Sequence, residues 1–466
     1  MRVTRRGLLV GAAVGGGLLV AWGLMPRRYD APLQPGAGEY AFGAWLKIGR
    51  DGVVTVAVPQ LEMGQGVTTL IPQVVASELG ADWRQVAVEP APVSGAYANV
   101  PLAAHWAPLW MPFAAGLAQG EEPVFAERFA QFARFNATAL GSSLAAYELP
   151  AREAAAAARA MLCMAAADRW DAAWEECEAS EGFVRLGDRR LRFADLAADA
   201  SGYQPPDPPP LRTEPLHERP IAGEAEQASA FPRLDTPSKV DGSYLFAGDV
   251  RLPGMVYAAI RHAPLPEGEL THFAARRTQG LVHLVRHKRW LAAVATNWWA
   301  AEQALNAAEA RFTVTGPLDS DMIDARLERG LIEGMAIRVA TRGDGDAAMG
   351  EPNLTLRYEM APALHATLET ASATARLADG RLELWLASQA PELAREAAAR
   401  AVGLNVEDVV LYPMPAGGSF DRRLEHDHAI EVALIAREVG RPVQLVWSRW
   451  QESLAGRPRA PAKALL

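Results

Sequence analysis

The feature that most constrains the fold is a proline-rich stretch, QPPDPPPLRTEPLHERP, at residues 204–220. Proline fixes its own φ angle and has no backbone N–H, so such a stretch cannot form the interior of a helix or a central strand. It suits an extended linker instead. We therefore place a linker over residues 205–230, with separate domains before and after it. The length of 466 residues allows roughly three domains.

The first thirty residues predict an export signal. Basic side chains at Arg5 and Arg6 come directly before a long uncharged run that extends to Pro26. The letters TRRGLL, at residues 4–9, resemble a twin-arginine signal, and that pathway exports folded proteins, often with a cofactor inside. We therefore expect residues 1–30 to direct the chain to the periplasm. The alternative is a membrane anchor at the N-terminus, because about twenty apolar residues can span a bilayer.

Charge and cysteine content exclude several classes of site. The formal net charge is −9 and no long basic patch interleaved with aromatic residues occurs, so we expect no nucleic-acid partner. The two cysteines, Cys163 and Cys177, form no C-x-x-C pair, so neither an iron–sulfur cluster nor a structural zinc site is encoded. Cys163 lies in an alanine-rich segment that predicts a helix and a buried position. Its spacing from Cys177 leaves open whether the two pair in an oxidising compartment.

Two glycines interrupt the segment VPQLEMGQGVTTLIPQVVASELG, residues 58–80. The preceding residues predict two strands joined by a turn at Asp51-Gly52, and the following residues predict an amphipathic helix. A structural interpretation of Gly64 and Gly66 needs only a tight turn, because glycine reaches positive φ with little strain. A functional interpretation adds backbone N–H groups that approach an anionic ligand, such as phosphate, at the start of a helix.

The rest of the chain mixes strands and helices. Residues 100–145 are rich in tryptophan and predict irregular structure, followed by the alanine-rich helix and by a hairpin with its turn at Gly187-Asp188. Residues 231–318 combine strands with a helix. Strand and helix patterns then alternate over residues 345–450, where a second glycine loop occurs. The predicted fold class is therefore α+β, with several domains.

The order of these motifs resembles the molybdopterin-binding subunit of the xanthine dehydrogenase and aldehyde oxidase superfamily, of the isoquinoline 1-oxidoreductase β-subunit type. MGQG at residues 63–66 looks like the first cofactor loop of that family, and RLDTPSKVDGSYLFAGDVRLPGMVYAAI, from Arg233, looks like the entry to its hammerhead domain. SQAP at 388–391 looks like the family's Thr-Gln-x-Pro loop, and GGSFDRR at 417–423 like its Gly-Gly-Gly-Phe-Gly-Arg-Arg loop. GRPVQLVWSR looks like the strand that follows them.

The resemblance implies a domain plan and a set of cofactor contacts. The domains would be an N-terminal molybdopterin-binding segment (31–204), the hammerhead domain (231–318), an incomplete first molybdenum-cofactor-binding domain (345–450) and a tail (451–466). Both glycine loops would surround the molybdenum cofactor, with no protein side chain bound directly to the metal. The implied contacts are Gly64, Gln65, Gly66, Gln389, Gly417, Gly418, Ser419 and Phe420.

The resemblance also implies a reaction and partners. The reaction would be hydroxylation of an N-heterocycle or oxidation of an aldehyde, with water as the oxygen source. The cofactor would be molybdopterin with molybdenum, expected in its cytosine dinucleotide form. Because this chain encodes no cluster, electrons would pass to a small 2Fe–2S subunit, with a cytochrome c as a further partner.

Three departures from the family pattern bear on that reaction. Asp421 stands where the family has glycine, and a carboxylate near an oxyanionic metal centre is unfavourable. Glu369-Thr370 stands where the family shows Glu-Pro. The chain also stops at Leu466, before the half in which the family carries its general-base glutamate, so no catalytic residue is assigned. This leaves three interpretations open: a fragment, a split subunit whose missing half lies on a second chain, or a degenerate copy. The competing, non-enzymatic hypothesis is an inactive, membrane-tethered paralogue that acts as a scaffold.

Two histidine-containing stretches are interpreted as structural. EHDH at residues 425–428 looks like a metal cluster, but histidines two positions apart on a helix point to different faces. Acidic residues are also ordinary at the start of a helix. His365 is likewise interpreted as structural, although it lies close to Glu369, a position of the family pattern. The sequence therefore predicts no metal bound directly by the protein.

Overall fold

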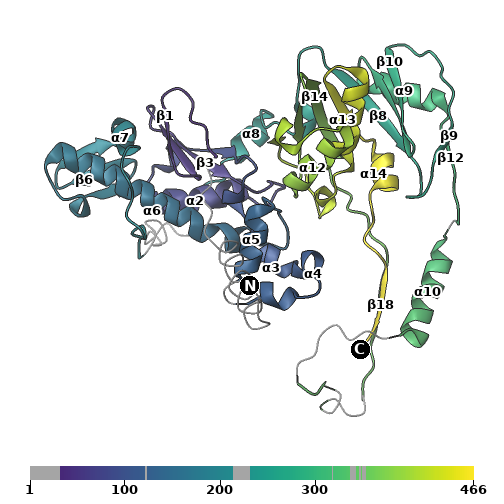
Figure 1. Ribbon diagram of the computed structural model, residues 1–466, viewed down its shortest axis with the longest axis horizontal. Coiled ribbons are helices and arrows are strands. Elements are labelled where there is room, and N and C mark those ends of the chain that lie inside the picture. The colour runs from purple at the N-terminus through teal and green to yellow at the C-terminus, as the bar shows by residue number, and fades with distance from the viewer. Residues whose placement is uncertain are drawn as a thin grey trace, which may run out of the picture. The chain divides into compact units, whose positions relative to one another are not determined.

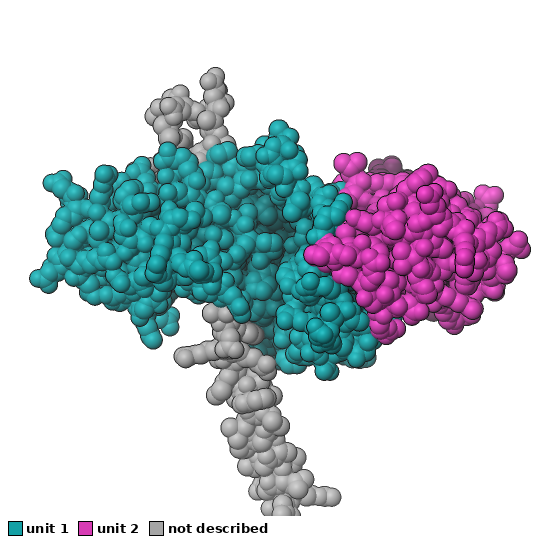
Figure 2. All heavy atoms as spheres, turned by 90° about the horizontal axis from the view of Figure 1, so that it is seen from above, with its two compact units in different colours: residues 1–251, 373–417, 423–434 teal, residues 252–372, 418–422, 435–466 magenta. Residues whose placement is uncertain are grey.

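The computed structural model describes residues 32–120, 123–213, 231–316, 318–335, 343–345, 348 and 353–466. The predicted signal (1–30), the linker after Thr213 and most of the charged stretch near 342–350 lie outside these residues. The chain divides into two compact units, coloured separately in Figure 2. Unit 1 comprises residues 1–251, 373–417 and 423–434, and unit 2 comprises 252–372, 418–422 and 435–466. Both contain helices and strands, as the predicted α+β class requires.

Unit 1 begins with a four-stranded sheet that positions the first glycine loop. Its strands, in spatial order, are β1 (Glu39–Phe42), β2 (Leu46–Gly49), β3 (Val54–Val58) and β4 (Val86–Pro90). The predicted turn at Asp51-Gly52 joins β2 to β3, and the Asp51 carboxylate accepts the Val53 N–H at 3.0 Å. The pair β3 and β4 is parallel, so a crossover is needed, and helix α2 (Val67–Leu79) supplies it.

The alanine-rich segment forms one long helix, as predicted. Helix α6 (Ser143–Trp170) lies alongside α2 in Figure 1, because its small alanine side chains allow close approach of the two backbones. Helix α7 (Phe193–Ala200) and a three-stranded sheet also pack near α6. That sheet contains β5 (Glu178–Ser180), β6 (Phe183–Leu186) and β7 (Arg189–Arg192). The predicted turn at Gly187-Asp188 joins β6 to β7.

The tryptophan-rich region differs from its prediction of irregular structure. It forms three short helices, α3 (Val100–His105), α4 (Ala107–Trp110) and α5 (Val124–Phe132). The Asn99 side chain caps α3 by accepting the Leu102 N–H at 3.1 Å. Trp110 stacks on Phe129 with ring centroids 4.2 Å apart. The fully buried residues of the core between them are all alanine, with larger side chains such as Trp110 and Phe129 only partly buried against it, so no strong apolar periodicity marks these helices in the sequence.

The described part of the proline-rich stretch is held against the helices of unit 1. Arg159 donates a hydrogen bond to the Pro210 carbonyl, and Arg152 donates one to the Arg212 carbonyl at 2.9 Å. Both arginines belong to α6. Up to Thr213, therefore, hydrogen bonds to α6 hold the stretch against unit 1.

A second βαβ arrangement in unit 1 positions the other two predicted motifs. Strands β14 (Ser372–Ala378) and β15 (Arg381–Leu386) form an antiparallel pair, and β16 (Val409–Pro413) is parallel to β15. Helix α12 (Pro391–Val402) crosses between β15 and β16; it begins at a proline and Gly403 follows its last residue, as expected for the start and stop of a helix. Helix α13 (Asp427–Val439) follows the second glycine loop.

Unit 2 is built on strands β10 (Leu281–Arg286), β11 (Trp290–Ala295), β8 (Val256–His262) and β17 (Val443–Val446) in that spatial order. Helix α9 (Trp298–Ala308) packs on β8 and β11. Strands β9 (Leu270–His272) and β12 (Arg311–Phe312) pair beside them, and α10 (Ser320–Glu333) comes next in the chain. These strands and α9 match the pattern predicted from the sequence.

The tail at residues 451–466 contains regular secondary structure. Helix α14 (Arg449–Ala455) begins with a hydrogen bond from the Gln451 N–H to the Ser448 hydroxyl at 3.3 Å. Strand β18 (Ala462–Leu465) then pairs with β13 (Arg357–Met360), a partner about a hundred residues away that local sequence cannot indicate. Among the residues that the structure describes, no helix combines the length and apolar character needed to cross a membrane.

Candidate functional site

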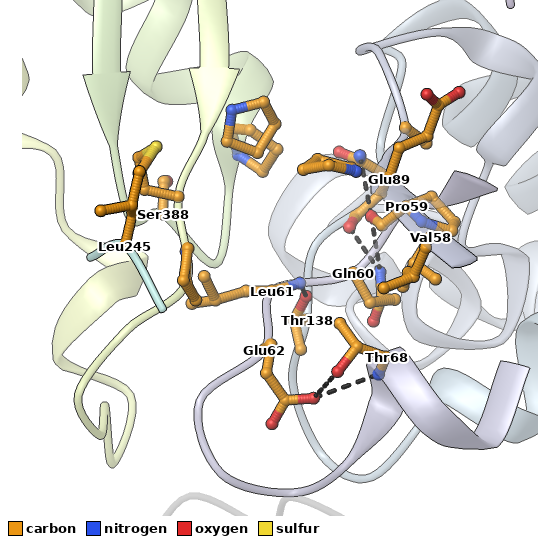
Figure 3. A pocket seen from close by; sticks show the side chains of 18 of the residues that line it. Val58, Pro59, Gln60, Leu61, Glu62, Thr68, Glu89, Thr138, Leu245 and Ser388 are labelled. Carbon is orange, nitrogen blue, oxygen red and sulfur yellow. Dashed lines mark hydrogen bonds between the residues drawn. The ribbon is translucent and has the colours of Figure 1, made fainter. Parts of the chain in front are cut away.

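A cavity of about 190 Å³ lies in unit 1 at the carboxyl ends of two parallel strand pairs (Figure 3). Strands β3, β4 and β16 end at its wall, at Val58, Pro90 and Pro413, and Ser388 follows β15. Ligands of open α/β sheets bind beyond such strand ends. Five of the lining residues are prolines, which bring no N–H donors to the wall, so much of the cavity is apolar. These prolines are Pro59, Pro90, Pro391, Pro413 and Pro415.

Residues in or next to the three motifs predicted to hold a cofactor line this cavity, but the eight predicted contacts are not among its lining residues. Leu61, Glu62 and Thr68 line it from either side of the first glycine loop, Ser388 and Pro391 from the Ser-Gln-Ala-Pro motif, and Met414 and Pro415 from just before the second loop. Two hydrogen bonds hold these segments in place. The Ala416 N–H donates to the Glu62 carbonyl at 2.8 Å, and the Gln389 side-chain amide donates to the Thr138 carbonyl at 2.6 Å.

The first glycine loop closes around the carboxylate of Glu62. That carboxylate accepts the N–H groups of Gly64 at 2.8 Å, Gly66 at 3.1 Å and Thr68 at 3.1 Å, and the Thr68 hydroxyl at 2.8 Å. The side chain of Glu62 is 3% exposed and points toward Thr68 in Figure 3. These donors lie at the start of α2, where a negative charge is favoured. Glu62 therefore occupies the position that an external anion would need.

The predicted contact Gln65 is held by its own loop. Its side-chain oxygen accepts the Met63 N–H at 2.8 Å, and its amide donates to the Leu61 carbonyl at 2.7 Å. Gly64 and Gly66 have φ values of 108° and 87°, so both use conformations that glycine adopts without strain. The turn interpretation thus agrees with the loop in this structure. A phosphate would have to displace the Glu62 carboxylate to reach the N–H groups of Gly64, Gly66 and Thr68.

The other predicted contacts lie on both units. Gln389 is fully buried in unit 1, where its backbone N–H donates to the Arg423 carbonyl at 2.8 Å. Gly417 also belongs to unit 1, whereas Gly418, Ser419 and Phe420 belong to unit 2. In unit 2, Ser419 is buried and Phe420 is 60% exposed.

The departure at Asp421 has a backbone consequence. Asp421 has a φ of 70° and follows Phe420 with a φ of 53°. Both values lie in the left-handed region, which glycine enters more easily than other residues. The glycine of the family motif therefore matches the local backbone, and aspartate keeps the conformation at the cost of strain.

The histidines occupy structural positions. The two ring nitrogens of His365 lie 2.6 Å from the Phe420 carbonyl oxygen and 2.9 Å from the Arg457 carbonyl oxygen, so the ring links the second loop to the segment after α14. In the Glu425–His428 stretch, α13 begins at Asp427 and His428 is buried.

Sequence reasoning missed a charge cluster beside the first loop. Arg233 donates to both oxygens of Asp235, at 2.9 and 2.7 Å, and Lys239 donates to one of them at 2.6 Å. Arg233 also donates to the Gly64 carbonyl at 3.3 Å and lies 3.6 Å from the Glu62 carboxylate. The only indication of this cluster in the sequence was that Arg233 begins the predicted hammerhead entry.

We expect Asp235→Asn to lower stability in a pH-dependent way. The hydrogen bonds from Arg233, followed by those from Lys239, lower the pKa of the buried Asp235 carboxyl from 3.8 to about 2. A lowered pKa stabilises the folded chain above pH 3.8, and this stabilisation is lost as the pH falls through about 2. The variant should therefore lose roughly 2 kcal/mol of unfolding free energy at pH 6. Denaturant unfolding at several pH values should show this difference shrinking below pH 4. The exposed variant Asp188→Asn should show no such trend, and a constant difference for Asp235→Asn would contradict the assignment.

Comparison with known proteins gives two matching family models. Each is described as a molybdopterin cofactor-binding domain; one matches residues 332–465 and the other residues 11–101. The chain is 29% identical to the β-subunit of isoquinoline 1-oxidoreductase from Brevundimonas diminuta, across 96% of this chain and 60% of that protein. It is 24% identical to the membrane-bound aldehyde dehydrogenase (pyrroloquinoline-quinone) of Gluconacetobacter polyoxogenes, across 99% and 57%. It is also 24% identical to a nicotinate dehydrogenase subunit of Pseudomonas putida, across 90% and 33%.

The chain thus spans at most 60% of the length of these curated relatives. Among solved structures, the aldehyde oxidoreductase of Desulfovibrio gigas aligns with a TM-score of 0.42 and 14% identity, across 88% of this chain and 51% of that one. The resemblance predicted from the motifs is confirmed by the family models and the curated relatives. The chain carries molybdenum-cofactor-binding domains of the xanthine dehydrogenase and aldehyde oxidase family.

Proposed function

We propose that the chain binds molybdopterin with molybdenum and serves as a subunit of an exported oxidoreductase that hydroxylates N-heterocycles or oxidises aldehydes. The observation that carries this proposal is that the Ser-Gln-Ala-Pro motif and the segments next to both glycine loops line one cavity of unit 1. The names of the relatives support the substrate classes, since they describe an isoquinoline oxidoreductase, an aldehyde dehydrogenase and a nicotinate dehydrogenase. When bound, the cofactor supplies the two-electron oxidation with water as the oxygen source.

The residues around the cavity fit one part of the cofactor. A largely apolar cavity of about 190 Å³ has the size of a flat ring system, since an engineered apolar cavity of about 150 Å³ binds benzene. Gln389, held beside Thr138, and Gln65 remain the proposed polar contacts to the pterin and the metal centre. The N–H groups of the first loop do not fit a phosphate while Glu62 accepts their hydrogen bonds.

The proposal includes partners and a compartment. A small 2Fe–2S subunit takes the electrons, and a cytochrome c receives them next. Two relatives are themselves named as subunits, which supports assembly with other chains. The cytosine dinucleotide form of the cofactor and export by the twin-arginine pathway are part of the same proposal, the latter supported by Arg5 and Arg6 before the apolar run.

A second candidate is an inactive scaffold. The hydrogen bonds that Glu62 accepts in the first loop favour it, because they use donors that a dinucleotide phosphate could otherwise bind. The strained aspartate at position 421 favours it as well, since the family pattern has glycine there. An inactive chain would keep the fold and lose the cofactor.

The deciding experiment is elemental analysis for molybdenum on the chain purified from the periplasmic fraction of its own host. The intact mass of every co-purifying chain is measured on the same sample. The proposed enzyme predicts one molybdenum per chain and a co-purifying iron–sulfur subunit. A metal-free chain purified alone supports the scaffold, and recovery only from the cytoplasm contradicts export.

A further inference from the structure

The two cysteines of the chain come together in unit 1, far from the cavity motifs in sequence. Cys163 lies inside helix α6 and is 4% exposed, and Cys177 is half-buried directly after the short helix η4 (Trp174–Glu176). Both are free thiols in the structure. The sequence contains no other cysteine, so neither thiol has another partner within the chain.

The chain reverses direction to bring these residues together. Helix α6 ends at Trp170, and Asp171 adopts a left-handed conformation with a φ of 51°. This turn directs η4 back along α6, against which it packs. Cys177 then lies beside the helix two turns before its end, and both cysteines contact one apolar cluster that includes the partly buried Trp174.

The two cysteines are close neighbours in unit 1. The Cys163 sulfur lies 3.8 Å from the Cys177 carbonyl oxygen. The Cβ of a residue lies within about 3 Å of its own carbonyl oxygen, so the Cys177 side chain starts close to the Cys163 sulfur. The Cys177 sulfur lies 3.9 Å from the Ala173 carbonyl oxygen, a weak contact that rotation about χ1 can break. A disulfide needs two Cβ atoms about 3.5–4.5 Å apart, so its formation requires the segment after η4 to adjust until the two Cβ atoms reach that separation.

We propose that Cys163 and Cys177 form an intramolecular disulfide when the chain meets a small-molecule disulfide oxidant. The half-buried Cys177 thiolate attacks one sulfur of the oxidant and releases one thiol. Cys163 then loses its proton, attacks the Cys177 sulfur and displaces the second thiol. Two protein thiols are thereby oxidised to one disulfide, and one oxidant disulfide is reduced to two thiols.

The environment sets the order of these steps. Burial raises the pKa of the Cys163 thiol to about 12, with the nearby Cys177 adding to the rise, so Cys163 is a poor first nucleophile. Cys177 reaches solvent and is the entry point for the oxidant. The bond would close a loop of about fifteen residues, which ties η4 and β5 to α6 and should raise the melting temperature by about 5–10 °C.

The test uses the full chain, native and incubated with oxidised glutathione. We expect the intact mass to fall by two hydrogens, and peptide mapping to give one linked peptide that contains both cysteines. Alkylation after denaturation should label neither residue. The reduced and oxidised chains should differ in melting temperature by the amount given above.

Two variants make the test specific. Cys163→Ala should retain one glutathione on Cys177, and Cys177→Ser should take up none, with neither showing an oxidant-dependent rise in melting temperature. The proposal is overturned if both cysteines of the oxidised wild-type chain can still be alkylated. It is also overturned if the wild-type chain retains glutathione on Cys177, as Cys163→Ala does, without forming the linked peptide.

Discussion

Replacing Glu78 with alanine is expected to lower the free energy of unfolding by about 3–5 kcal/mol. Glu78 lies in α2 and its side chain is 1% exposed. Its carboxylate lies 3.1 Å from a guanidinium nitrogen of Arg152 and 3.1 Å from one of Arg159, and it accepts the Arg212 N–H at 2.8 Å. Removing the carboxylate that these groups share leaves the arginines without their counter-charge in a largely buried place.

The measurement is denaturant unfolding at neutral pH. Glu148→Ala is the matched control, because Glu148 is exposed on helix α6 and its loss should change stability by less than about 0.5 kcal/mol. Glu78→Gln keeps the shape of the side chain and removes the charge. Its loss of unfolding free energy should therefore lie between those of Glu78→Ala and Glu148→Ala. If Glu78→Ala and the control Glu148→Ala have the same unfolding free energy, water must hydrogen-bond to the arginine side chains in place of the carboxylate.

The Glu78 group also explains how the proline-rich stretch is held. Arg159 and Arg212 donate to the Glu78 carbonyl, each at 2.9 Å, so one residue of α2 binds both α6 and the stretch. Burial lowers the pKa of both guanidinium groups. We therefore expect proteolysis within residues 204–213 to accelerate in Glu78→Ala.

Most elements of the fold were predictable where the apolar pattern is strong. The strand-loop-helix unit at residues 54–79, the alanine-rich helix α6 and the alternation from β15 to α13 all appear where the sequence indicates them. Helices α3 to α5 were not predicted, because buried positions occupied by alanine give little contrast between apolar and polar positions. Strand β18 was not predicted either, because its pairing with β13 depends on a distant segment.

The sequence indicated the segments around the site, whereas the hydrogen bonds within the site were not predicted. Three motifs far apart in the sequence were expected to meet; Ser388 of one motif and Leu61 and Met414, which lie next to the two glycine loops, line one cavity, whereas the eight predicted contacts are not among its lining residues. The role of Glu62 was missed, although a carboxylate directly before two alternating glycines could have indicated a self-capped loop. The contact between Arg233 and Gly64 could not be deduced, because it joins residues that are separated by the whole of α6.

The second large effect is expected for Glu62→Ala. This change leaves the N–H groups of Gly64, Gly66 and Thr68 and the Thr68 hydroxyl without their acceptor. Each buried donor left without a partner costs about 1–3 kcal/mol, and water entering from the cavity offsets part of that cost. We expect a net loss of about 2–4 kcal/mol in denaturant unfolding. Hydrogen exchange at Gly64, Gly66 and Thr68 should also become at least about tenfold faster.

The same variant separates the two interpretations of the glycine loop. If the loop can bind an anion, pyrophosphate should raise the melting temperature of Glu62→Ala, because an emptied cluster of N–H donors at the start of α2 attracts negative charge. It should not raise that of the wild-type chain, in which Glu62 already accepts these hydrogen bonds. Glu62→Gln retains an acceptor oxygen and should show a smaller loss of stability and no response to pyrophosphate. A Glu62→Ala chain that is destabilised but ignores pyrophosphate would leave only the turn interpretation, and a phosphate of the cofactor would then have to bind elsewhere.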